Sequence, residues 1–141
     1  MQKILIDTDV ILDFFFDRKP FSDDAAKILS LCESNEITGT ITSVIISNVY
    51  YLLRQTATHE KVVDKLVQLV AITGVLATDK SVIIKALNSN FKDFEDALQN
   101  FSAEQSGEID LIVTRNIKDY KKSRLGVLTP ENYLKTILSN R

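Results

Sequence analysis

The chain has few of the residues that build several common kinds of functional site. Among its 141 residues it holds one cysteine, Cys32, and one histidine, His59. A single cysteine excludes an internal disulfide and a cysteine-based zinc site, and a single histidine excludes a two-histidine metal motif. The four glycines form neither a G-x-G-x-x-G nor a G-x-x-x-x-G-K pattern, which excludes the common nucleotide-binding loops.

The chain also lacks an excess of charge of either sign and any long apolar run. Seventeen basic and nineteen acidic residues give a net charge of −2, so a surface for nucleic acid would have to be local. No basic-then-apolar leader opens the chain, and no apolar run approaches the roughly 20 residues that span a bilayer. We therefore expect a single domain over residues 1–141, located in the cytoplasm, with no membrane partner.

Strand and helix patterns alternate along the whole chain. Short runs typical of strands lie at residues 3–6, 37–42, 75–77, 111–114 and 127–128. Helical patterns fill the intervals, with Ser22 and Asp79 as expected N-caps, Gly107 as a helix end and Pro130 as a helix start. This alternation predicts an α/β fold of three layers, α/β/α, with a central, mainly parallel sheet of about five strands.

Acidic and amide side chains follow the ends of the expected strands. Asp7 ends the first strand and Asn116 follows the fourth, so both belong to the carboxyl edge of the sheet, where functional groups collect. On a later helix, Asp93, Asp96 and Asn100 share a sector of about 60°. Oxygen ligands at strand ends suit a hard cation such as Mg²⁺. Carboxylates crowded there without a metal would also have raised pKa values.

Five strings, in this order and spacing, carry a resemblance to a known family. They are IDTDVILD at 6–13, the helical segment 42–53, DFEDAL at 93–98, VTRN at 113–116 leading to Asp119 and Tyr120, and LTPE at 128–131. Through them the chain resembles a PIN domain, the metal-dependent nuclease fold. The form it resembles is the short prokaryotic one, similar to the toxins of type II toxin–antitoxin pairs.

The resemblance implies a metal site with Asp7, Asp96 and Asp119 as carboxylate ligands for Mg²⁺ or Mn²⁺. Asn48 stands where the family usually has glutamate, and it can offer an amide oxygen but no charge. Asn116 stands where many relatives have aspartate, so Asp119 is the carboxylate that could replace it. A site with fewer charges would bind metal more weakly, and would hold one ion rather than two.

The activity that the resemblance implies is hydrolysis of RNA phosphodiester bonds by an endoribonuclease. The residues implied in catalysis are Asp7, Asp96, Asp119, Asn116 and Thr114, the last two orienting a water or a carboxylate. The residues expected to bind the RNA backbone are Arg115, Lys118, Lys121 and Lys122. The other interpretation of this basic segment is a solvated loop. Partners in keeping with the resemblance are RNA, a cognate antitoxin protein and a second copy of the chain.

Two other functions compete with this one. The first is a catalytically weak or inactive PIN domain that binds RNA or a protein, which the amides Asn48 and Asn116 favour. The second is a phosphoacceptor signalling domain, which the acids after the first strand favour. The second needs an aspartate at the end of the third strand and a lysine after the fifth, where this chain has Ala77 to Asp79 and Thr129-Pro130. We therefore reject it.

Overall fold

Five parallel strands form one central sheet in the computed structural model, which describes residues 1–139. The strands are β1 (Lys3–Ile6), β2 (Thr38–Thr42), β3 (Gly74–Leu76), β4 (Leu111–Val113) and β5 (Gly126–Leu128). Their order is β3-β2-β1-β4-β5, and every neighbouring pair is parallel. The expected fold class is confirmed, and no strand end is shifted by more than one residue. Because β1 is central, Ile4, Leu5 and Ile6 are all fully buried.

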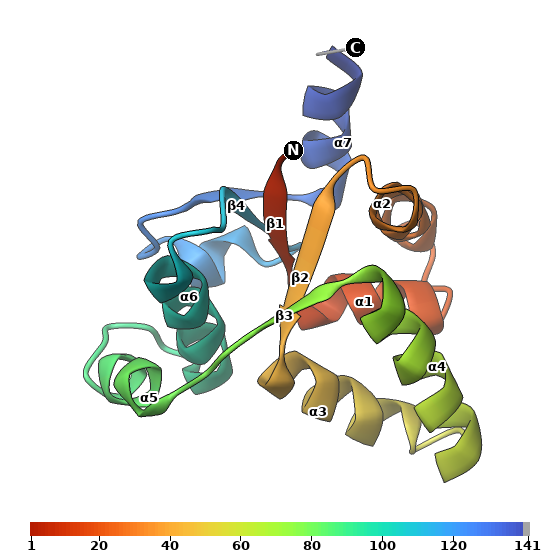
Figure 1. The fold of residues 1–141 in the computed structure, drawn as a ribbon, viewed down its shortest axis with the longest axis horizontal. Coiled ribbons are helices and arrows are strands. Elements are labelled where there is room, and N and C mark those ends of the chain that lie inside the picture. The colour runs from red at the N-terminus through yellow and green to blue at the C-terminus, as the bar shows by residue number, and fades with distance from the viewer. Residues whose placement is uncertain (140–141) are drawn as a thin grey trace.

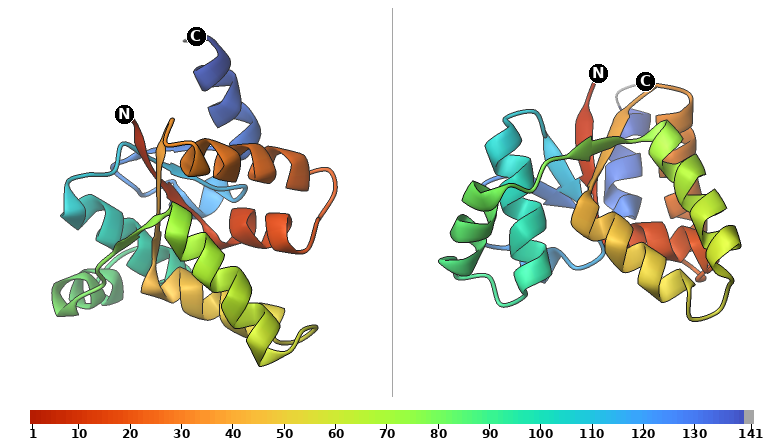
Figure 2. Two further views of the ribbon diagram at one scale, coloured as in Figure 1. Left: turned by 45° about the vertical axis from the view of Figure 1, so that its right-hand side comes forward. Right: turned by 60° about the horizontal axis from the view of Figure 1, so that its bottom comes forward.

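Helices cover both faces of the sheet (Figures 1 and 2). They are α1 (Thr8–Phe15), α2 (Ser22–Glu33), α3 (Ser43–Leu53), α4 (His59–Ile72), α5 (Lys80–Leu87), α6 (Phe94–Ser106) and α7 (Pro130–Ser139), with a 3-10 helix η1 (Ile117–Tyr120). Helices α5 and α6 lie on one side of the sheet, and α1, α2 and α4 lie on the other (Figure 1). Helix α3 follows β2 directly and contacts both α1 and α6. No described helix is long and apolar enough to cross a membrane.

The helix ends follow the expected signals with one exception. Asp79 caps α5, and Gly107 ends α6 in the left-handed conformation at φ 67°, which glycine adopts without strain. Ser22 as an N-cap was a wrong prediction. The cap position of α2 belongs to Phe21, whose backbone is already helical, because the preceding turn bonds the Ser22 amide to the Arg18 carbonyl at 2.7 Å.

Candidate active site

Asp7 and Thr114 meet at the carboxyl edge because β1 and β4 are neighbours in the sheet. Ile6 pairs with Val113, and the next residue of each strand turns toward the same edge. The Thr114 hydroxyl donates a hydrogen bond of 2.8 Å to Asp7 Oδ2, and the Thr8 amide donates one of 2.8 Å to Asp7 Oδ1. Asp7 is 4% exposed, so its carboxylate is held in a fixed orientation inside the protein.

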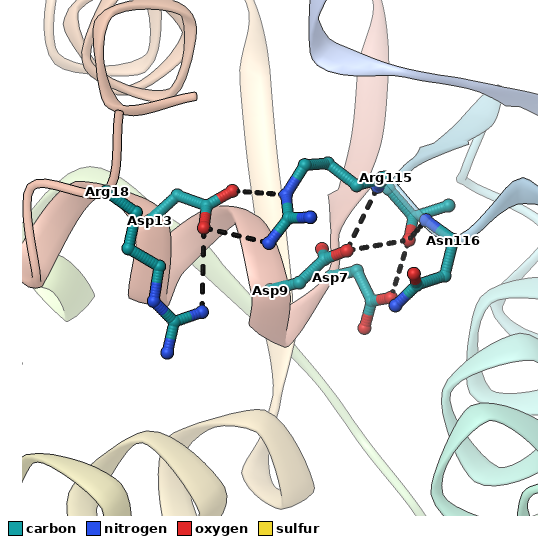
Figure 3. A network of polar contacts seen from close by, with 7 residues as sticks. Asp7, Asp9, Asp13, Arg18, Arg115 and Asn116 are labelled. Carbon is teal, nitrogen blue, oxygen red and sulfur yellow. Dashed lines mark hydrogen bonds and ion pairs between the residues drawn. The ribbon is translucent and has the colours of Figure 1, made fainter. Parts of the chain in front are cut away.

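Asp9 joins Asp7 from the first turn of α1. Its Oδ2 accepts a hydrogen bond of 3.0 Å from the Arg115 backbone amide (Figure 3). Its Oδ1 is buried and has no hydrogen-bond partner among the described residues. The sequence analysis did not select Asp9 as a site residue. Its spacing of two residues from Asp7, across a strand-to-helix turn, was the signal that could have identified it.

Asp96 approaches from the opposite side of the site, on the first turn of α6. It is half-buried, and the Tyr120 hydroxyl lies 3.2 Å from its Oδ1 and 2.9 Å from Gln99 Oε1. Tyr120 is fully buried on η1, and its single hydroxyl proton can serve either acceptor. Tyr120 is therefore a hydrogen-bond partner of Asp96 that the sequence alone did not reveal, and Gln99 is a second acceptor beside the same hydroxyl.

Burial and mutual repulsion weaken the acidity of these carboxyl groups. Burial, and then the charges of Asp9 and Asp96, raise the pKa of Asp7 to about 7. Burial, and then the charges of Asp93, Asp119 and Asp9, raise the pKa of Asp96 to about 7. The pKa of Asp9 is raised as well, chiefly by burial. The crowded carboxylates therefore include Asp9 as well as Asp7 and Asp96.

Asp119 and Asn116 lie at the surface beside this group. Both are exposed, and Asp119 is close enough to Asp96 for its charge to raise the pKa of Asp96. The Asn116 backbone amide donates a hydrogen bond of 3.0 Å to the Thr114 hydroxyl oxygen. The side chain of Asn116 extends from the turn that also carries Thr114 and Arg115 (Figure 3).

Asn48 contacts Glu95, an acid in the first turn of α6 that was not among the predicted site residues. Its Nδ2 donates a hydrogen bond of 2.8 Å to Oε2 of Glu95 on α6. No hydrogen bond between described side chains joins Asn48 to Asp7 or Asp96. The side-chain amide of Asn48 is thus engaged with a carboxylate next to Asp96 in the sequence.

Arg115, which the sequence predicted to bind the RNA backbone, forms an ion pair with the buried Asp13. Its Nε lies 2.6 Å from Asp13 Oδ2, and its terminal nitrogen lies 3.0 Å from Oδ1 (Figure 3). Arg18 lies 3.6 Å from the same carboxylate, and the Arg115 guanidinium stacks 4.0 Å from the Phe21 ring centroid. This clamp, Asp13 with Arg115 and Arg18, ties the turn after β4 to α1.

The oxygen donors fit a hard divalent cation in kind, but they do not form a closed ligand set. Asp7, Asp9 and Asp96 supply carboxylate oxygens, and the unpartnered Oδ1 of Asp9 is a buried acceptor that a cation would satisfy. Among the described residues, no three acidic, histidine or cysteine side chains stand close enough together to hold an ion. The charges of Asp7, Asp96 and Asp119 therefore influence one another, but the three carboxylates do not form a preformed metal site.

Known proteins are similar to this chain in sequence and in fold. The chain is 26% identical over 137 residues to ribonuclease VapC1 of Aquifex aeolicus, covering 94% of this chain and 93% of the relative. A toxin–antitoxin complex from Klebsiella pneumoniae aligns with a TM-score of 0.67 at 20% identity, over 90% of this chain and 97% of that one. VapC20 of Mycobacterium tuberculosis, described as a sarcin–ricin loop cleaving toxin, aligns with a TM-score of 0.59 at 15% identity, over 77% of this chain and 86% of that one.

The two structural alignments show a shared fold, and a family match adds to them. The family model described as PIN domain matches residues 3–118, which include Asp7, Asp96 and the turn after β4. The resemblance noted in the sequence is therefore confirmed, and the chain belongs to the PIN domain family.

Proposed function

We propose that the chain is a metal-dependent endoribonuclease and the toxin half of a toxin–antitoxin pair. One observation carries this: Asp7 is almost fully buried, and among the described residues no cation lies within ion-pair distance of it. A buried carboxylate is costly unless it is paired, and a bound cation would pair it. The charges of Asp9 and Asp96 make that cost larger.

Asp7 and Asp96 would hold Mg²⁺ or Mn²⁺, with Asp9 beside them and Asp119 at the surface. When bound, such an ion polarises a phosphoryl oxygen and lowers the pKa of a water, which supplies hydroxide without a histidine. Thr114 fixes the orientation of Asp7 through its hydrogen bond. Tyr120 does the same for Asp96.

The remaining roles lie at the mouth of the site. Asn116 is exposed next to Thr114, where its amide can orient a water or a carboxylate. Asn48 would contribute an amide oxygen, since its hydrogen bond to Glu95 uses only the nitrogen. Lys118, Lys121 and Lys122 are exposed and would attract the RNA backbone.

The substrate and partner in this proposal are supported by what the similar proteins are described as doing. The curated relative is named a ribonuclease, and VapC20 is described as cleaving the sarcin–ricin loop. The Klebsiella structure is described as a toxin–antitoxin complex. We therefore propose RNA as substrate and an antitoxin as partner. Co-expression with the neighbouring reading frame, followed by co-purification, tests the partner.

Cleavage of a labelled single-stranded RNA at pH 7.5 tests the activity. We expect cleavage with Mn²⁺ or Mg²⁺, none with a chelator, and loss of activity in Asp7→Asn and Asp96→Asn. Asp64→Asn, which removes an exposed carboxylate on α4, is the matched control and should cleave normally. Metal-independent cleavage, or full activity in Asp7→Asn, would contradict the proposal.

A second candidate function is a PIN domain that binds RNA or a protein without cleaving. It is favoured by the neutral Asn48, by its engagement with Glu95, and by the absence of a closed three-ligand set among the described residues. RNA binding without cleavage at any Mn²⁺ concentration, in a folded protein, would favour this candidate over the nuclease.

A further inference from the structure

Four lysines from two separate segments line one cavity beside the candidate site. The cavity has a volume of about 440 Å³ and lies between residues 90–93, which join α5 to α6, and residues 118–122, in and after η1. Its charged lining residues are Lys92, Lys118, Lys121, Lys122, Asp93 and Asp119. We call this cavity the lysine cleft. Lys92 belongs to it only through the fold, because it precedes the basic segment by more than twenty residues.

The charges of these four lysines are not neutralised at close range, and the fold gathers all four around one cavity. All four are exposed, and none forms an ion pair within 4.0 Å with a described residue. By contrast, Lys19 pairs with Asp17 and Asp23, and Lys135 pairs with Glu131. The lysine cleft therefore concentrates positive charge on a protein whose net charge is −2.

The lysine cleft is joined directly to the carboxylates of the candidate site. Asp93 in its wall accepts a hydrogen bond of 2.9 Å from the Asp96 amide. Phe91, also in the wall, packs edge-on against Tyr120 at 6.3 Å, and the Tyr120 hydroxyl contacts Asp96. A strand whose phosphate reached Asp96 would therefore continue along this cleft.

We infer that the lysine cleft binds the sugar–phosphate backbone of single-stranded RNA next to the bond that is cut. This inference rests on the proposed function, and it adds Lys92 and the path of the RNA strand along the cleft. Lysines on both walls can meet one strand, and lysine recognises phosphate as a point charge without reading sequence. Because the Phe91 ring is already packed against Phe101 and Tyr120, we expect no stacking on a base and no sequence preference from this cleft.

The salt dependence of RNA binding tests the inference. Binding of a fluorescent single-stranded RNA is followed by anisotropy in chelator, from low to high salt, so that no cleavage occurs. For single strands, each neutralised phosphate contributes about 0.7 to the slope of log K against log salt concentration. We expect Lys92→Gln to reduce that slope by about 0.7, and the triple variant Lys118→Gln/Lys121→Gln/Lys122→Gln to reduce it by about 2.

The matched control is Lys61→Gln, which removes one exposed lysine from α4, away from the cleft. It should leave the slope unchanged, and melting curves should show that every variant is folded. The loss should be equal for RNAs of different sequence.

A slope for Lys92→Gln equal to that of wild type overturns the inference, and so does a wild-type protein that binds no RNA in chelator. A protein that instead captures only an acidic polypeptide through these lysines overturns it too. The cleavage assay with metal is read separately, so the nuclease proposal can survive the loss of this cleft.

Discussion

Asp13 and Asp7 lie six residues apart at the same edge of the sheet, and their surroundings are of opposite charge. Both are nearly fully buried, at 1% and 4% exposed. Asp13 receives the guanidinium of Arg115 through two hydrogen bonds and has Arg18 at 3.6 Å. Asp7 accepts hydrogen bonds from the Thr114 hydroxyl and the Thr8 backbone amide. The charges that raise its pKa are those of Asp9 and Asp96.

This difference separates a structural acid from a candidate functional one. The charge of Asp13 is neutralised by cations of the protein itself. Its role is to hold the turn after β4 against α1. The charge of a buried carboxylate that is surrounded by other carboxylates is neutralised only when a cation binds from solution. The predictions below test this contrast in order of expected effect.

Removing the cation of the structural acid should have the largest effect on stability. Arg115→Met leaves Asp13 buried with only Arg18 nearby, and breaking a buried pair this way costs about 3 to 5 kcal/mol. Urea denaturation measures the loss. Combining it with Asp13→Asn removes the stranded charge and should restore part of the stability. A single variant within 1 kcal/mol of wild type would show that the clamp is not a closed pair.

The functional acid should make the metal-free protein less stable as pH rises. The pKa of Asp7 is raised from 3.8 to about 7 on folding, so the folded state holds the proton more tightly and the free energy of unfolding falls between about pH 4 and pH 7. From pH 5 to pH 8 we expect a loss of about 2 to 3 kcal/mol from Asp7. Denaturation in chelator at both pH values measures it.

Asp7→Asn is the matched variant for this measurement, because it removes the titrating group and keeps its size. The pH dependence should become clearly flatter, whatever the variant loses in hydrogen bonding to Thr8 or Thr114. An equally steep fall in Asp7→Asn would place the cause elsewhere in the protein.

Tyr120→Phe should have a smaller effect, since it removes one hydroxyl and keeps the buried ring. The one hydroxyl proton that Asp96 and Gln99 share is lost, which costs about 1 to 2 kcal/mol in a buried setting. The pKa of Asp96 should rise further, because the hydrogen bond from Tyr120 favours its charged form. NMR titration of Asp96 and thermal denaturation measure the two effects. An unchanged Asp96 pKa would mean that the hydroxyl serves Gln99 alone.

Asn48→Glu should change stability least, because the site of substitution is partly exposed. The new carboxylate would stand beside Glu95, where Asn48 now donates a hydrogen bond, and should lower metal-free stability by about 0.5 kcal/mol. If position 48 reaches the metal, Mn²⁺ affinity should rise with the added charge, as calorimetry would show. Adding Glu95→Gln should relieve the repulsion. If stability, affinity and cleavage all stay at wild-type values, position 48 lies outside the site.

The sequence predicted the sheet well because its strands are short runs of apolar or β-branched residues, and several are followed by clear helix caps. It also predicted that Asp7 and Asn116 follow neighbouring strands at one edge, and the pairing of Ile6 with Val113 brings the turns after β1 and β4 to that edge. It did not reveal the partners of Arg115 or Asn48. Those depend on which side chains of α1 and α6 face the turn and helix α3, and a pattern along one chain does not encode contacts between elements so far apart.

The short helix η1 is the other feature that sequence patterns did not predict. Its four residues, Ile117–Tyr120, are too few to show a hydrophobic period, and the lysines around them are typical of a solvated loop. Yet η1 carries Tyr120 into the core beside Asp96 and places Lys118 in the lining of the lysine cleft together with Lys92.

Calorimetric titration of Mn²⁺ at pH 8 tests the central claim most directly, because the carboxylates are then ionised without metal. We expect Mn²⁺ to bind wild-type protein, and binding to weaken at least tenfold in Asp7→Asn but not in Asp64→Asn. That outcome would show that a bound cation neutralises the charge of Asp7, as Arg115 neutralises that of Asp13. Equal Mn²⁺ affinity in wild type and Asp7→Asn, or no binding to the folded wild-type protein, would contradict the account.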